Sequence, residues 1–174
     1  RELFETGFGT DQTLTISGGN DRTLFYLSGN YNYTDGMIVG SNDALKRVTV
    51  RLNGSQRVSD RLKVSGNIAY ANTGGRFIQR GNNVSAILLG GLRTPPQFNN
   101  LPDTADNGQH RSYNLPDPLP TETRSSRVFD NPFFVIRKFD DRAQTDRVFG
   151  NIGAEWQAFD WLKFNYTLGA DYYD

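Results

Sequence analysis

Apolar and polar residues alternate along six stretches of this chain, and the stretch 46–59 has the most regular pattern. There Val48, Val50 and Leu52 are separated by charged and polar residues, and only Gln56 interrupts the apolar positions. A period of two places successive side chains on opposite faces of a β-strand. The alternation predicts six strands, at about 10–18, 22–34, 46–59, 61–73, 145–158 and 161–173.

The connections between these predicted strands are alternately short and long. Turn sequences of two or three residues (GND, SD and FD) follow the first, third and fifth strands. About eleven residues (35–45) follow the second strand, and the long loop 74–144 follows the fourth. In an up-and-down meander, all short turns then lie at one edge of the sheet. Outer-membrane β-barrels have this asymmetry, with tight periplasmic turns and long outer loops.

The length of the strands and their alternation fit a sheet that crosses a bilayer. Hydrocarbon cannot pair with backbone N–H and C=O groups, so strands span a membrane only in a closed barrel. A tilted crossing needs about 9–11 residues, with lipid or lipopolysaccharide against the apolar face. Aromatic residues stand near predicted strand ends, where interfacial girdles lie: Tyr31, Tyr33, Tyr70, Trp156, Trp161, Tyr172 and Tyr173.

The predicted fold class is therefore all-β: an antiparallel up-and-down meander, part of a large transmembrane outer-membrane β-barrel with one very long extracellular loop. The alternative is a soluble β-sandwich that binds a carbohydrate or a peptide. A sandwich explains the alternation, but soluble strands usually have about 5–6 residues, and it gives no reason for the loop asymmetry. Closing such a barrel takes about eight strands, so we expect six strands to be a piece of a larger barrel or an oligomer.

Composition excludes some functions and leaves the barrel open. Lys+Arg and Asp+Glu both number 19, and this balance argues against a nucleic-acid partner. The chain has no cysteine, so disulfides and thiolate metal sites are excluded. Its mean hydropathy of −0.60 is typical of soluble proteins. That value does not exclude a barrel, because spanning strands carry apolar residues on one face only.

Several motifs resemble the SusC/RagA family of TonB-dependent outer-membrane transporters. They occur in order from about residue 7 to the end of the chain: ISGGNDRTLFYLSGNYNYTDGMIVGSN, KRVTVRLN, VSDRLKVSGNIAYANT, LLGGLRTPP, DNPFFVIRK and VFGNIGAEWQAFDWLKFNYTLGADYYD. The resemblance implies a barrel of roughly 22 strands closed by an N-terminal plug. We expect residues 1–174 to be a middle part of that barrel, without the plug or the TonB-binding segment.

The same resemblance implies a function and partners. Members of this family import oligosaccharides or peptides across the bacterial outer membrane. Import depends on TonB, and a SusD-like surface lipoprotein usually acts as a lid. These properties are expectations for this chain, since the alternation by itself indicates only a membrane-facing sheet.

The long loop holds the residues most suited to ligand contacts. We expect a short helix in NVSAILLGGLRTPP, capped by Ser85 and stopped by Pro95 and Pro96. Loops of this length are usually functional or disordered. Candidate contacts to a ligand or to the lid are Phe77, Arg80, Phe98, His110, Arg111 and Tyr113. The alternative is that these side chains only order the loop.

A set of basic residues is predicted to face the lumen: Arg47, Arg51, Arg57, Lys63 and Arg147. A hydrated lumen tolerates these charges, whereas each basic residue at the lipid midplane costs about 2–4 kcal/mol. Two roles remain open. The charges either pair with acids on the plug, which we favour, or guide an anionic solute.

No motif for catalysis or for a cofactor is present. His110 is the only histidine, and no nucleophile or metal-hydrolase motif accompanies it. The DTADNG segment lacks an oxygen ligand at its third position, where Ala105 stands, so it does not form an EF-hand. We therefore expect no enzyme activity, no metal and no cofactor. An enzyme built on a barrel is the least favoured of the three hypotheses.

Overall fold

The computed structural model describes residues 2–40, 42–106, 108, 110–113 and 129–174. The chain divides into two compact units. One unit, called here the sheet, comprises residues 9–34, 45–75 and 144–174. The other, called the loop body, is built from the described parts of residues 1–8, 35–44 and 76–143.

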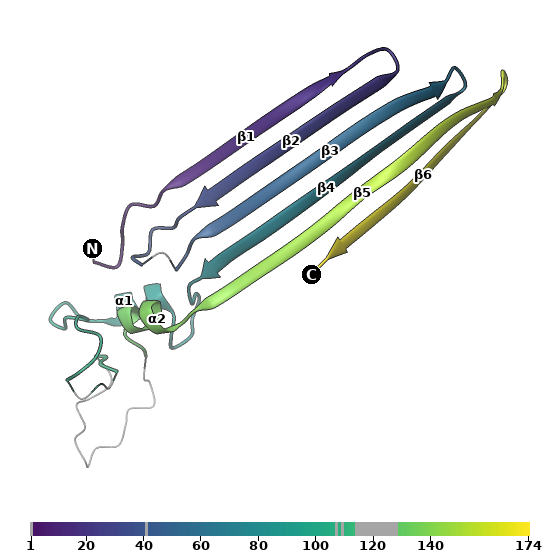
Figure 1. Cartoon of the computed structure of the whole chain (residues 1–174). Helices are drawn as coiled ribbons and strands as arrows, with labels where there is room; N and C mark the ends of the chain where they lie inside the picture. The colour runs from purple at the N-terminus through teal and green to yellow at the C-terminus, as the bar shows by residue number, and fades with distance from the viewer. Residues whose placement is uncertain (1, 41, 107, 109, 114–128) are drawn as a thin grey trace. The chain divides into compact units, whose positions relative to one another are not determined.

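The sheet is a six-stranded antiparallel meander in which every strand pairs with its neighbour in sequence (Figure 1). This confirms the predicted antiparallel up-and-down meander. The strands are β1 (Gly9–Gly19), β2 (Thr23–Thr34), β3 (Leu45–Ser59), β4 (Leu62–Phe77), β5 (Asp141–Phe159) and β6 (Leu162–Tyr173). Turns of two or three residues join β1 to β2, β3 to β4 and β5 to β6, all at one edge of the sheet. This edge is called the short-turn edge.

The β-ladder aligns apolar side chains of successive strands on one side of the sheet, called here the apolar face. One row across four strands consists of Ile16, Leu27, Leu52 and Ile68. Leu52 and Ile68 remain 46% and 53% exposed. A sandwich would cover such residues with a second sheet, but the described residues form a single sheet. The apolar face therefore lacks a protein layer within the described part of the chain.

Aromatic side chains gather where β5 and β6 meet their turn. Trp156 stacks on Phe164 with ring centroids 5.8 Å apart, and Phe159 stacks on Trp161 at 5.7 Å. Trp161 is 80% exposed. Exposed indole rings at a strand end are typical of a membrane interface, because they combine an apolar ring with a polar N–H group.

Strand β4 extends to Phe77, four residues beyond its predicted end at 73. The alternation of apolar and polar residues ends at Gly74 and Gly75, but the ladder continues, pairing these glycines with Lys46 and Leu45. Backbone hydrogen bonds require no side chain, so a strand can continue where its sequence pattern stops.

The loop body contains two helices of seven residues each, α1 (Ile87–Arg93) and α2 (Pro132–Lys138). Neither helix is long and apolar enough to cross a membrane. The helices enclose a small core of Ile38, Ile87, Val135 and Ile136. Leu3, Val39 and Ile78 pack against this core.

Helix α1 was predicted, but its predicted cap was wrong. Its N-cap residue is Ala86, which makes no side-chain capping hydrogen bond. The Ser85 hydroxyl instead donates to Asp130 Oδ2 at 2.5 Å. A carboxylate is a stronger acceptor than a neutral group, so the hydroxyl bonds across the loop body. Pro95 and Pro96 follow the end of the helix, as expected.

Candidate functional site

The connection between β4 and β5 is organised by one buried side chain, Asn131, which is 1% exposed. Its Nδ2 donates to the carbonyl oxygens of Asn100 at 2.6 Å and Arg111 at 2.8 Å. Its Oδ1 accepts from the backbone N–H of Phe133 at 2.9 Å and caps α2. Asn131 therefore links two distant parts of the loop to the start of one helix.

His110 lies beside this buried asparagine. Its Nε2 accepts a hydrogen bond of 3.0 Å from the backbone N–H of Asn131, and its ring stacks on Phe134 with centroids 4.0 Å apart. Burial lowers the pKa of His110, while the negative charges of Asp130 and Asp103 oppose this shift. The ring is neutral in this arrangement, because Nε2 can accept only when it carries no proton. The structure thus gives His110 a positioning role within the loop.

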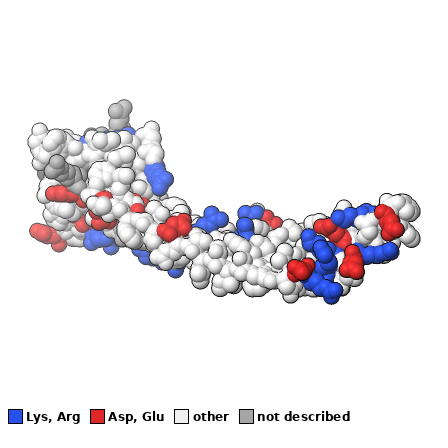
Figure 2. Space-filling model, turned by 90° about the horizontal axis from the view of Figure 1, so that it is seen from above, with Lys and Arg blue, Asp and Glu red and all other residues white. Residues whose placement is uncertain are grey.

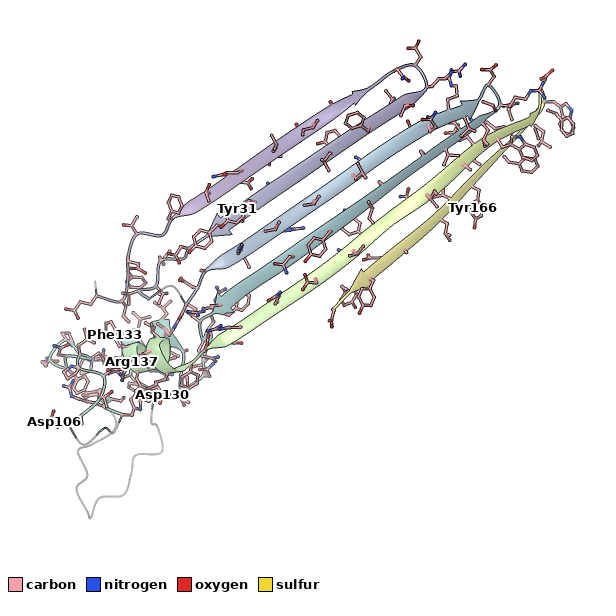
Figure 3. All side chains as sticks on the ribbon, in the orientation of Figure 1. Tyr31, Asp106, Asp130, Phe133, Arg137 and Tyr166 are labelled. Carbon is pink, nitrogen blue, oxygen red and sulfur yellow. The ribbon has the colours of Figure 1, made fainter. Side chains whose placement is uncertain are left out.

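A second contact in this region involves Arg137 on α2. Its Nε donates to Asp103 Oδ2 at 2.9 Å, and its guanidinium also donates to the Thr104 hydroxyl. Figure 3 labels Arg137 together with Phe133 and Asp130 around this helix. A charge-assisted pair of this kind fixes the 103–104 segment against α2.

Three of the predicted contact residues come together in the loop body. The guanidinium carbon of Arg111 lies 4.6 Å from the ring centroid of Phe98, and Tyr113 meets the same ring edge-on at 5.8 Å. Arg111 Nη1 donates to the carbonyl oxygens of Asn99 and Pro102 at 2.8 and 2.9 Å. Tyr113 is 48% exposed. The cluster presents an aromatic surface with a cation fixed beside it, an arrangement that can stack on a sugar ring or a peptide side chain.

Phe77 and Arg80 do not join this cluster. Phe77 ends β4 and is 39% exposed. Arg80 lines a separate pocket of about 620 Å³ in the loop body, next to Gln79. Apolar side chains form most of its wall: Phe4, Met37, Ile38, Ile78, Leu88, Leu89 and Leu92.

The sequence prediction missed the part played by Asp43 in this pocket. Asp43 lines the pocket, and its Oδ2 accepts from the backbone N–H of Ile38 at 3.1 Å. Its other oxygen is buried without a hydrogen-bond partner among the described residues. The one available signal was the apolar run MIV inside an otherwise polar connection, which marks a segment that packs.

On the sheet, the five predicted basic residues share the side opposite Val50, called here the charged face. Arg47 pairs in register with Asn32 and Thr73, Arg51 with Ser28 and Ala69, and Arg57 with Lys63. Arg147 bonds to Asp171 and lies 4.9 Å from the Phe149 ring centroid. Within the described residues, the other four basic side chains have no carboxylate within ion-pair distance.

Acidic side chains on the charged face are engaged by neighbours on adjacent strands. Asp11 accepts from the side-chain amides of Asn30 and Asn32 at 2.7 and 3.0 Å. Glu155 pairs with Lys163 at 2.6 Å. The charged face therefore combines satisfied acids with unpaired cations, and it can attract anionic groups from outside the described sheet.

No metal-binding group of three or more histidine, cysteine or acidic side chains occurs in the described ranges. The residues between 114 and 128, which belong to the predicted long loop, lie outside the described structure. The arrangement offers stacking, hydrogen bonding and charge attraction, which are means of binding.

Comparison with known proteins gives matches over almost the whole chain. The chain is 28% identical over 171 residues to "TonB-dependent receptor P3" of Formosa agariphila, covering 97% of this chain and 16% of that receptor. Its fold matches a chain in the structure of the RagAB peptide importer in the closed-closed state, with a TM-score of 0.70 and 21% identity. This match covers 99% of the present chain and 18% of that chain. No protein-family model matches.

These comparisons confirm the resemblance predicted from the sequence. The chain spans less than a fifth of the length of these two proteins. The similarity is therefore to a segment of a TonB-dependent receptor, and the six strands have the fold of part of a large β-barrel. Neither of the two matched proteins is named as an enzyme.

Proposed function

We propose that this chain is a segment of the barrel of an outer-membrane importer. The complete protein takes up oligosaccharides or peptides in a TonB-dependent way, under a SusD-like surface lipoprotein. The apolar face meets lipid, the charged face meets the lumen, and the long connections after β2 and β4 begin on the outer side, where solute arrives. The role is binding and passage, without chemical conversion of the solute.

The observation that carries this proposal is the difference between the two faces of the sheet. The row Ile16–Leu27–Leu52–Ile68 is apolar and exposed, whereas the neighbouring row on the other face includes Ser28 and Arg51. Water would leave the first row unfavourably exposed, since burying apolar area contributes about 25 cal/mol per Å². Hydrocarbon on one side and a hydrated lumen on the other satisfy both rows.

The four unpaired basic residues fit a lumen that contains another part of the protein. We infer that Arg47, Arg51, Arg57 and Lys63 pair with acids on the plug. We favour plug pairing over guidance of an anionic solute, because unpaired cations that line a lumen attract carboxylates held permanently beside them. Under the rival role, uptake of anionic solutes would fall when these residues are neutralised, and uptake of neutral solutes would not.

The decisive test labels the two faces separately in the complete polypeptide. Single cysteines replace Val50 and Arg51, carry nitroxide labels, and are compared in lipid vesicles. We expect lipid-soluble oxygen to speed the spin relaxation of the label at position 50, and a water-soluble nickel complex to speed that of the label at 51. If neither reagent reaches the label at 50, protein covers this face, and the soluble sandwich would replace the importer.

A second experiment addresses the solute and the lid. Purified complete protein is titrated with oligosaccharides and with peptides, with and without the surface lipoprotein. Binding that strengthens with the lipoprotein supports the proposed assembly. If neither oligosaccharides nor peptides bind, with or without the lipoprotein, import of these solutes is contradicted.

A further inference from the structure

The apolar face has a hollow at the point where two glycines stand side by side. Gly54 on β3 pairs in register with Gly66 on β4. Together they form the floor of a depression of about 540 Å³. Since glycine has no side chain, the surface here lies one side chain lower than its surroundings.

Bulky apolar side chains stand around this floor. Phe25 on β2 is in register with Gly54, and the Ile152 backbone of β5 lies 3.8 Å from the position a Gly66 Cβ would occupy. The remaining apolar side chains of the wall are Leu52, Val64 and Ile68. The hollow is thus a slot for an apolar group with a width of about two strands, roughly 10 Å.

The walls of the hollow do not depend on strands outside this chain. They come from β2, β3, β4 and β5, and each of these strands has a neighbour on both sides in the sheet. Further barrel strands beyond β1 or β6 would leave the hollow unchanged.

The depth of the hollow along the strands indicates what fills it. Gly54 lies five residues from Ser59, the last residue of β3 at the short-turn edge, which corresponds to about 16 Å along an extended strand. Half of the hydrocarbon core of a bilayer is about 15 Å thick. A group that reaches the hollow from the short-turn edge therefore has the length of an acyl chain.

Two arginines at the short-turn edge can contact a phosphate headgroup. Arg22 lies in the β1–β2 turn and Arg61 in the β3–β4 turn, and both are exposed. Each short turn also carries an aspartate: Asp21, Asp60 or Asp160. Arg61 lies 3.5 Å from Asp160, while Arg22 has no ion-pair partner in the described part of the chain and is the arginine free to contact the phosphate. Figure 2 shows charged side chains gathered at this end of the sheet, whereas the middle of the strands in view has few.

We propose that the hollow over Gly54 and Gly66 holds one acyl chain of a phospholipid from the leaflet next to the short turns. The phosphate of this lipid lies against Arg22 and Arg61. The proposal rests on the proposed function, because it requires the apolar face to meet lipid. It adds a specific, ordered lipid where the barrel surface would otherwise be uniform.

The test uses the complete polypeptide in nanodiscs containing a phospholipid with a photoreactive diazirine near the end of one acyl chain. After illumination, labelled peptides are mapped by mass spectrometry. In the unmodified protein we expect labelling to concentrate on peptides that contain Leu52–Gln56 and Val64–Ile68. Labelling spread evenly over the apolar face would overturn the proposal.

Two variants make the result specific. Gly54→Leu fills the hollow without a backbone clash, because the nearest atom to its added Cβ is 3.9 Å away. Gly29→Leu adds the same side chain to the apolar face outside the hollow, where no atom lies within 4 Å. We expect a several-fold loss of labelling in Gly54→Leu and none in Gly29→Leu. An equal response of both variants would contradict the proposal.

The headgroup is tested by Arg22→Gln combined with Arg61→Gln, which should lower labelling at the hollow without changing barrel assembly. Unchanged labelling would contradict the phosphate contact. Labelling of the hollow by a lipopolysaccharide probe from the other leaflet would contradict a phospholipid as its occupant. Access of oxygen to the spin label at position 50 separates the importer proposal from the lipid-site proposal. If that label is exposed to lipid and the hollow still shows no enriched labelling, only the lipid site fails.

Discussion

The sheet and the loop body differ in whether their apolar side chains are buried within the protein. In the loop body, Ile87 and Val135 are each 1% exposed and belong to one small apolar core. In the sheet, Leu14 is 70% and Ile152 56% exposed. One unit contains its own interior, and the other needs apolar surroundings supplied from outside. The stability of the loop body therefore depends on contacts inside it, including buried polar hydrogen bonds. The stability of the sheet depends on which face each residue occupies.

The largest expected effect comes from placing a charge on the apolar face. Val50→Arg in the complete polypeptide should prevent barrel assembly, since a basic residue in hydrocarbon costs about 2–4 kcal/mol. Arg51→Ala, one position away on the charged face, should assemble normally. The measurement is heat-modifiable gel mobility and the yield of protein in outer membranes. Normal mobility of Val50→Arg would contradict the assignment of the two faces.

The loop body should respond to loss of its buried link. Asn131→Ala removes the cap of α2 and leaves the carbonyl oxygens of Asn100 and Arg111 without their donor. Leaving a buried polar group unpaired costs about 1–3 kcal/mol. We expect faster hydrogen exchange in residues 97–113 and 129–139, with β1 to β3 unchanged.

The matched control for this variant is Asp106→Ala, because Asp106 is exposed in the same loop (Figure 3). Its exchange should equal that of the unmodified protein. Faster exchange throughout the sheet in Asn131→Ala would mean that the two units are not independent in stability.

A smaller effect is expected on ligand affinity. Tyr113→Ala removes an exposed ring that meets Phe98 edge-on, and an aromatic contact contributes about 0.5–1.5 kcal/mol. Binding of the imported solute or the lid should weaken by about tenfold or less, with hydrogen exchange unchanged. Calorimetric titration against the complete protein measures the change. Unaltered affinity for both partners would leave the Phe98–Arg111–Tyr113 cluster with a purely structural role.

The smallest effect is a pH dependence confined to the loop body. The pKa of His110 is lowered in the folded loop below its usual value of 6.5, so the unfolded loop binds a proton more readily. The stability contributed by the neutral ring is present above about pH 6.5 and declines as the pH falls toward the folded pKa. The effect is small because Asp130 and Asp103 partly stabilise the charged ring.

Limited proteolysis between pH 7.5 and 5 measures this dependence. Cleavage of the loop should increase toward the acidic end, and the sheet should stay resistant. His110→Gln removes the titrating group, so its cleavage should vary less with pH. A profile that is the same in both proteins would assign the pH dependence to other groups.

The sequence by itself determined the sheet. A period of two, read along β3 from Arg47 to Leu52, separates the apolar face from the charged face, and the turn lengths fix the meander. These features are local, since each depends on residues that are neighbours in the chain or across a short turn. The motifs also identified the similarity to TonB-dependent receptors that the comparisons support.

Only the tertiary structure decided the loop body. Sequence analysis missed α2 and misassigned Ser85 as a cap, and it did not predict that Asn131 would join Asn100 to Arg111. Helices of seven residues have little intrinsic stability, and they form here because packing and side-chain hydrogen bonds hold them. Those contacts join residues far apart in the chain, such as Ser85 and Asp130 at a separation of 45 positions, and no local pattern encodes such a pairing. The hollow over Gly54 and Gly66 depends in part on a distant pairing as well, because Ile152 of β5 forms one of its walls.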